Sequence, residues 1–168
     1  MFYEPSKGHG LKRDPFKNLV VPRPIGWISS LDGQGVANLA PFSFYNAICL
    51  EPPIVVFGLD LKPDGKEVKD TLRNIEETHE FVVNLPTWAQ LDAVLKSATH
   101  APHGVSEFDL AGLGRLPSRL VKPPRVEGGL RPTSNAATCR RPCYPARRRT
   151  PGTSRSSARS SGFISTMP

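Results

Sequence analysis

The run Lys69-Asp70-Thr71 offers the clearest chemistry in the sequence, because it lies where a polar loop changes into a short helical pattern. The lysine carries a cation, the threonine a hydroxyl, and the start of a helix leaves backbone N–H groups without intrahelical acceptors. Together these groups can converge on a phosphate. The alternative is that Asp70 or Thr71 caps the helix while Lys69 faces solvent, and on the residues alone capping is the more common arrangement.

The other reactive side chains have no spacing that suits a metal site or an acid–base pair. Cys49 lies in an apolar run and Cys139 and Cys143 in a basic segment, which supports neither a disulfide framework nor a zinc site. The four histidines also lack metal-ligand spacing, and the carboxylates are scattered along the chain. We therefore expect no metal and nominate no catalytic side chain.

Strand and short helix patterns alternate along the first three quarters of the chain. Residues 32–35 (DGQG) form a turn signal between two strand patterns, which predicts a hairpin. No regular βαβ period and no glycine-rich nucleotide loop are present, so a mainly β, antiparallel barrel with short helices is favoured over a doubly wound sheet. The sequence predicts strands at 25–31, 36–40, 54–58 and 81–85, and helices at 70–78 and 89–97.

The positive charge of the chain is confined to its end. The chain has 168 residues and a net charge of +7, but residues 131–168 hold eight Arg and no acidic residue. The preceding 130 residues hold 14 Lys and Arg against 15 Asp and Glu, a net charge of −1. The tail is rich in Arg, Ser, Thr and Pro without periodicity, so we expect it to be disordered rather than a nucleic-acid-binding arm.

Nothing in the sequence predicts secretion or membrane insertion. Residues 1–12 are polar and contain glycine, unlike a signal peptide, and no apolar run approaches the roughly 18 to 20 residues of a membrane span. We expect a cytoplasmic protein without membrane contact. The length is enough for one domain, since a single core typically uses roughly 100 to 150 residues.

Seven segments agree in order and spacing with one known family. They are 22–30 (PRPIGWISS), 38–46 (NLAPFSFYN), 52–53 (PP), 69–75 (KDTLRNI), 81–85 (FVVNL), 104–113 (GVSEFDLAGL) and 118–126 (SRLVKPPRV). Together they resemble the flavin reductase-like, FMN-binding split-barrel family. The resemblance covers residues 1–127, which we take as the domain, and residues 128–168 do not match it.

The resemblance implies a homodimeric Greek-key split β-barrel that binds FMN without a covalent bond and often uses NAD(P)H. In this chain we expect the barrel to be incomplete. A flavin needs backbone donors and acceptors along its ring edge, and the segment 38–46 can supply them, because Pro41 and the aromatics interrupt a regular ladder. The resemblance also favours the phosphate role for the 69–71 run. The implied cofactor-binding residues are Ser29, Ser30, Asn38, Ala40, Pro41, Phe42, Ser43, Asn46, Lys69, Asp70 and Thr71.

Two of these assignments are alternatives to each other. Ser29 and Ser30 are consecutive in a predicted strand, so they point to opposite faces and at most one is expected to reach the cofactor. Trp27, in the same strand, is expected in the core rather than against a flavin.

Three functions remain open. The first is an oxidoreductase that transfers reducing equivalents between NAD(P)H and flavin, in some relatives as one component of a monooxygenase. The second is an FMN-binding electron carrier that does not turn over a nicotinamide. The third, nucleic-acid binding, depends only on the charge of the tail.

The tail has a further property that the genetic code can test. The codons can be read in a second frame, in which each new codon consists of the third base of one codon and the first two bases of the next. In that frame the codons for residues 133–136 can encode His-Leu-Glu-Cys. Residues 156–168 likewise permit Phe-Ile-Gly-Glu-Val-Val-Gly-Phe-His-Ile-Asp-Asp-Ala, which alternates as a barrel strand does. Both shifts run in the same direction. The sequence after about Glu127 is therefore predicted to be an out-of-frame translation of the remaining barrel strands.

Overall fold

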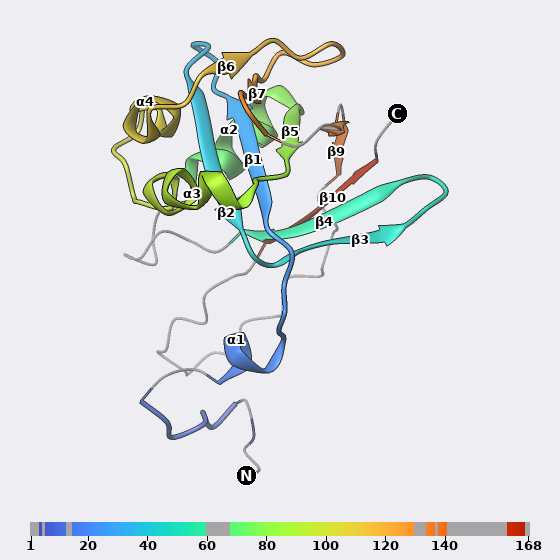
Figure 1. Cartoon of the computed structure of the whole chain (residues 1–168). Helices are drawn as coiled ribbons and strands as arrows, with labels where there is room; N and C mark the ends of the chain where they lie inside the picture. Colours follow the sequence, from blue (N-terminus) through green and yellow to red (C-terminus); the bar gives the residue numbers. More distant parts are fainter. Residues whose placement is uncertain are drawn as a thin grey trace.

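The protein is described here by a computed structural model that covers residues 4, 6–12, 15–59, 68–129, 134–136, 138–140 and 161–166. The described part is built on two four-stranded antiparallel sheets and a two-stranded ribbon (Figure 1). The first sheet contains, from one edge to the other, β2 (Ala37–Phe42), β1 (Gly26–Leu31), β5 (Phe81–Asn84) and β8 (Ser134–Ala136). The second contains β3 (Tyr45–Cys49), β4 (Ile54–Leu59), β10 (Ser161–Thr166) and β9 (Thr138–Arg140), and the ribbon pairs β6 (Arg115–Leu116) with β7 (Arg125–Val126).

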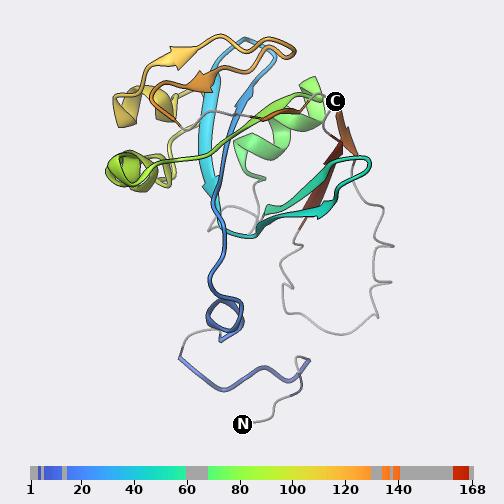
Figure 2. The ribbon, with the colours of Figure 1, turned by 45° about the vertical axis from the view of Figure 1, so that its right-hand side comes forward.

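The described residues also form short helices. They are α1 (Phe16–Leu19), α2 (Asp70–Thr78), the 3-10 helix η1 (Trp88–Gln90), α3 (Leu91–Ser97) and α4 (Glu107–Ala111). Helix α2 packs against β1, whereas α3 and α4 pack against each other and against β2, and α1 lies apart on the N-terminal arm (Figures 1 and 2). No helix in the described ranges is long and apolar enough to cross a bilayer.

The predicted hairpin is confirmed by the pairing of β1 with β2. Asp32 organises its turn, because one carboxylate oxygen accepts hydrogen bonds from the backbone N–H groups of Gln34 (2.9 Å) and Val36 (2.8 Å). Gly35 has a φ of +84°, a conformation that favours glycine. The predicted strands and helices elsewhere are confirmed by β4, β5, α2 and α3, so the mainly β architecture with short helices holds.

Strand β2 forms one edge of its sheet and runs without interruption through Pro41, which pairs with Trp27 of β1. The expectation that Pro41 interrupts the ladder is therefore wrong. Proline is tolerated there because its missing N–H falls on the edge away from β1. On that same outer edge, the Leu39 N–H donates to the Glu107 carboxylate at 3.1 Å and the Ala37 carbonyl accepts from the Ser106 hydroxyl.

The core consists of two clusters on the faces of the first sheet. In one, the rings of Phe42, Phe57 and Phe81 pack with centroids 5.4 and 5.2 Å apart, among aliphatic side chains of β1, β4 and α2. In the other, Trp27 packs with Leu39, Phe108 and Val126. The burial of Trp27 confirms its expected place in the core.

Three stretches of the basic tail form strands. β8 pairs with β5, β10 pairs with β4, and β9 pairs with β10, so these stretches belong to the same two sheets as the first 127 residues. This differs from the disorder expected from composition, because ladder hydrogen bonds use backbone groups and require no apolar pattern. The rest of the expected tail lies outside the described residues. β8 and β10 fall within 133–136 and 156–168, the two stretches that gain strand-like sequences on regrouping.

Candidate functional site

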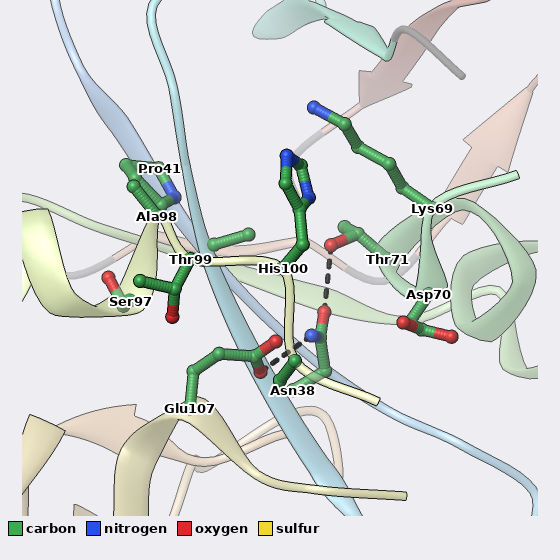
Figure 3. A pocket seen from close by; sticks show the side chains of 12 residues that line it. Asn38, Pro41, Lys69, Asp70, Thr71, Ser97, Ala98, Thr99, His100 and Glu107 are labelled. Atoms are coloured by element: carbon green, nitrogen blue, oxygen red, sulfur yellow. Dashed lines mark hydrogen bonds between the residues drawn. The ribbon is translucent and has the colours of Figure 1, made fainter. Parts of the chain in front are cut away.

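A pocket lies between the outer edge of β2, the start of α2 and the segment that follows α3 (Figure 3). Six of the eleven nominated residues line it: Asn38, Ala40, Pro41, Lys69, Asp70 and Thr71. The remaining lining residues are Ser97, Ala98, Thr99, His100, Ala101 and Glu107. Residues that are about 30 positions apart in the sequence thus meet at one site, as the resemblance implied.

The start of α2 supplies the cationic side of the pocket. Lys69 occupies the N-cap position without a side-chain capping bond, so the capping alternative for Asp70 and Thr71 is wrong. The Lys69 ammonium lies 5.4 Å from the centroid of the Phe42 ring, within the range of a cation–π contact. In Figure 3 the Lys69 side chain and the His100 ring lie on the same side of the pocket.

The Asp70 carboxylate contacts two neighbouring basic side chains. Its carboxylate lies 2.8 Å from Nδ1 of His103 and 3.6 Å from the Arg73 guanidinium. A carboxylate in the first turn also stabilises the positive end of a helix. Asp70 therefore serves α2 and the loop that carries His103, and its charge is partly balanced beside the pocket.

A buried polar network forms the floor of the pocket. The Thr71 hydroxyl donates to Oδ1 of Asn38 at 2.7 Å, and Nδ2 of Asn38 donates to the Glu107 carboxylate at 2.7 Å. Thr71 and Glu107 are 1% and 6% exposed. Burial raises the pKa of Glu107, the hydrogen bonds from Leu39 and Asn38 lower it in part, and the negative charge of Asp70 adds to the increase.

Ser29 and Ser30 lie on opposite faces of β1 and both are fully buried. The Ser29 hydroxyl donates to the Pro124 carbonyl at 2.5 Å, on the side away from the pocket. The Ser30 hydroxyl faces Asn38 (3.4 Å) and accepts from Asn74 (3.1 Å), so it is joined to the polar network. Of the two serines, Ser30 is the one connected to the pocket, although it does not line it.

Three other nominated residues lie outside the pocket lining. Phe42 belongs to the core, with the Lys69 ammonium over its ring. Ser43 is half-buried between β2 and β3, and Asn46 is exposed on β3, where its side-chain oxygen accepts the Ala47 N–H at 2.9 Å. The structure does not bring these three together with Thr71, and their roles stay predictions.

The sequence interpretation missed half of the pocket wall. The predicted helix 89–97 ends where the lining segment 97–101 begins, and Glu107 is not among the residues that the sequence nominates. A serine and a glutamate at the start of a helix are typical of an ordinary first turn. Only their position against the edge of β2 makes Glu107 a buried pocket residue.

Arg23 has a structural role in the N-terminal arm. Its guanidinium donates to the carbonyls of Lys17 and Val20, the latter at 2.7 Å, and lies 5.0 Å from the centroid of the Phe44 ring. It therefore closes the C-terminal end of α1.

Comparison with known proteins identifies the domain. The flavin reductase like domain family matches residues 18–132. A protein of Aquifex aeolicus without an assigned function is 41% identical over 109 residues, which are 65% of this chain and 55% of that protein. A protein of Halalkalibacterium halodurans is 43% identical over 107 residues, 64% of this chain and 51% of that protein. This chain thus spans about half the length of the curated relatives it matches.

Solved structures share the fold. Nitrilotriacetate monooxygenase component B from Bacillus cereus superposes with a TM-score of 0.78 at 26% identity, covering 99% of this chain and 79% of that one. An FMN-binding domain of a flavin reductases-like enzyme from Shewanella baltica superposes with a TM-score of 0.62 at 19% identity, covering 86% and 65%. The chain belongs to the flavin reductase like domain family and has the split-barrel fold of its solved relatives.

Proposed function

We propose that the pocket beside β2 binds FMN and that the protein transfers reducing equivalents between NAD(P)H and the bound flavin. The observation that carries this proposal is the convergence of Asn38, Ala40, Pro41, Lys69, Asp70 and Thr71 on one pocket. All six residues lie in the segments 38–46 and 69–75, which resemble the motifs of the family.

The groups in the pocket suit the two ends of FMN. Lys69 and the N-terminal end of α2 provide a cation and a positive helix terminus for the phosphate. Pro41 lies on the outer edge of the sheet, where no described strand pairs with β2, so its carbonyl group is available to a ring edge, whereas the Ala40 backbone faces β1. When bound, the flavin supplies the hydride and electron chemistry, and these residues bind and orient it.

The pocket carries a carboxylate, Glu107, as well as the cation of Lys69. Glu107 disfavours an anionic group at the floor, whereas Lys69 and His100 lie on the opposite side. This separation of charge supports binding of the phosphate at the Lys69 side of the pocket and of the uncharged part of the ligand near Asn38.

We also propose a homodimer, and a monooxygenase as a possible acceptor of reduced flavin in the complete protein. Nitrilotriacetate monooxygenase component B, whose structure is similar to this chain, is by its name a monooxygenase component, which supports the second point. The first is supported by apolar side chains that a single chain leaves in solvent, such as Trp88 (86% exposed) and Leu95 (61%).

Two measurements on the full chain test the proposal. Purified protein reconstituted with FMN is expected to retain a flavin absorbance spectrum after gel filtration. It is then expected to oxidise NADH or NADPH faster than free FMN in buffer. Retained flavin without a nicotinamide-dependent rate would identify an electron carrier instead, and failure to retain or quench FMN at all would refute the binding site.

A further inference from the structure

Glu107 is a buried carboxylate of the pocket, to which the proposed binding of FMN assigns no contact with the ligand. It is the first residue of α4, and its side chain reaches the outer edge of β2 (Figure 3). One oxygen, Oε2, accepts two hydrogen bonds, from the Leu39 N–H at 3.1 Å and from Nδ2 of Asn38 at 2.7 Å. A carboxylate 6% exposed and held by two donors has a defined position.

These contacts determine the direction of the hydrogen bonds across the pocket floor. The Leu39 N–H is a backbone donor and can only donate, so Oε2 must be an acceptor. Asn38 therefore turns its NH₂ group to Oε2 and its carbonyl oxygen, Oδ1, to Thr71. Because Oδ1 can only accept, the Thr71 hydroxyl must give its hydrogen to Asn38, at 2.7 Å.

We propose that Glu107 is a positioning residue that, through Asn38, makes Thr71 a hydrogen-bond acceptor toward the ligand. This inference rests on the proposed binding of FMN. It changes the expected role of Thr71, because a hydroxyl whose hydrogen is held by Asn38 has only lone pairs for the pocket. Thr71 then accepts a hydrogen bond from a ligand hydroxyl, such as one on the ribityl chain, and the phosphate is bound by Lys69.

The charged groups near this network do not change which of its members donate hydrogen bonds and which accept them. Asp70 at the start of α2 is paired with His103 and Arg73, and Arg115, which follows α4, is paired with Asp109 at 2.8 Å. Lys69 and His100 also line the pocket. Leu39 and Asn38, both on β2, donate directly to the Glu107 carboxylate, and the backbone N–H of Glu107 itself also contributes a hydrogen bond.

Riboflavin, which lacks the phosphate, provides the test. The full chain is titrated with FMN and with riboflavin, and the affinities of Thr71→Val and Glu107→Leu are compared with wild type by flavin fluorescence quenching. Each variant is expected to weaken both ligands by the same factor, roughly fivefold to tenfold. The double variant is expected to lose little more than either single variant, because both break one chain of hydrogen bonds. Glu107→Gln is expected to lose less than Glu107→Leu, since an amide oxygen can accept the same two bonds.

Glu77→Leu is the matched control, because Glu77 also accepts a backbone N–H, from Gly33 at 3.3 Å, but lies outside the pocket. A loss of FMN affinity alone in Thr71→Val would show that Thr71 donates to the phosphate, and would overturn the proposal. Unchanged affinities for both flavins in Glu107→Leu would also overturn it. If Glu107→Leu does not fold, the comparison of FMN and riboflavin affinities in Thr71→Val still shows whether Thr71 donates to the phosphate.

A flavin-free readout separates this inference from the proposed function. In the ¹⁵N-labelled chain, the side-chain NH₂ signal of Asn38 is identified by its loss in Asn38→Ser. It is expected to shift as Glu107 titrates, and this response is expected to disappear in Glu107→Gln. A shifting signal in a chain that binds neither flavin would refute the proposed function but keep Glu107 as the positioning residue. A signal that does not respond in a flavin-binding chain would refute the positioning.

Discussion

The indole N–H of Trp27 donates to the Ser97 hydroxyl at 2.9 Å, and Ser97 in turn donates to the Val94 carbonyl at 2.9 Å. Both Trp27 and Ser97 are buried. This pair ties the first strand of the hairpin to the last residue of α3, and the segment that lines the pocket begins at Ser97. The fixed core is thus connected directly to the pocket wall.

Replacing Trp27 by Phe is expected to lower the free energy of unfolding by about 1 to 3 kcal/mol, because a buried hydrogen bond and part of a large ring are lost. Urea unfolding followed by circular dichroism measures this. Trp88→Phe is the matched control, since Trp88 is 86% exposed and should change stability little. Equal effects of the two substitutions would contradict the role of the Trp27–Ser97 pair.

Lys69→Ala is expected to weaken FMN binding by about 1.5 to 3 kcal/mol, roughly tenfold to more than a hundredfold, because it removes a charge-assisted phosphate contact. Riboflavin binding should change much less, and Trp27→Phe should affect FMN less than Lys69→Ala does. Isothermal titration calorimetry with both flavins measures the difference, with the exposed Lys122→Ala as control. Equal affinities of wild type and Lys69→Ala would exclude the phosphate assignment.

Glu107 should make stability depend on pH. Burial raises its pKa above the ordinary 4.5, so the folded state binds the proton more tightly than the unfolded state. Its favourable contribution is complete below about pH 4.5 and is lost as the pH rises through the raised pKa. Relative to Glu107→Gln, the wild type should therefore lose stability over that interval. Parallel stability profiles of the two proteins, measured by denaturation at several pH values, would contradict this expectation.

The complete domain is expected to be a dimer in solution. Trp88, Leu91 and Leu95 follow one another at helical spacing through η1 and α3, and all three are exposed in the single chain. Size-exclusion chromatography with light scattering on a full-length relative loaded with FMN tests this. A monomer mass with flavin still bound would show that the barrel works without a partner subunit.

The gene is expected to carry a one-base shift near the codon for Glu127. Restoring the frame should replace the basic tail by apolar barrel strands and give a more stable chain that binds FMN more tightly, because apolar strand residues can add to the core and Arg- and Ser-rich residues cannot. Sequencing the gene decides the first point, and unfolding and FMN titration of the restored chain decide the second. An intact reading frame together with a folded, FMN-loaded product carrying this tail would disprove the shift.

The sequence predicted the elements that depend on local pattern. The turn 32–35, the buried strand at 54–58 and the helix at 70–78 all follow from residues close together in the chain. The place of Trp27 in the core also follows from its position in an apolar strand.

The contacts that define the pocket were harder to predict, because they join distant residues. Asn38 meets Thr71 across 33 positions and Glu107 across 69 positions. Whether a glutamate at the start of a helix faces solvent or a sheet edge depends on how the helix packs in the fold, not on the residues next to it in the sequence. Asn46 shows the converse, since its motif predicts a ligand contact but β3 leaves it on the surface.

The occupied edge of β2 has a consequence for how the protein avoids misassembly. An open sheet edge is a template on which another chain can add a strand. Here the Ala37 carbonyl and the Leu39 N–H are already bonded to Ser106 and Glu107, and Pro41 has no hydrogen to offer. Fibrillar growth from this side of the sheet is therefore blocked by the same side chains that shape the pocket.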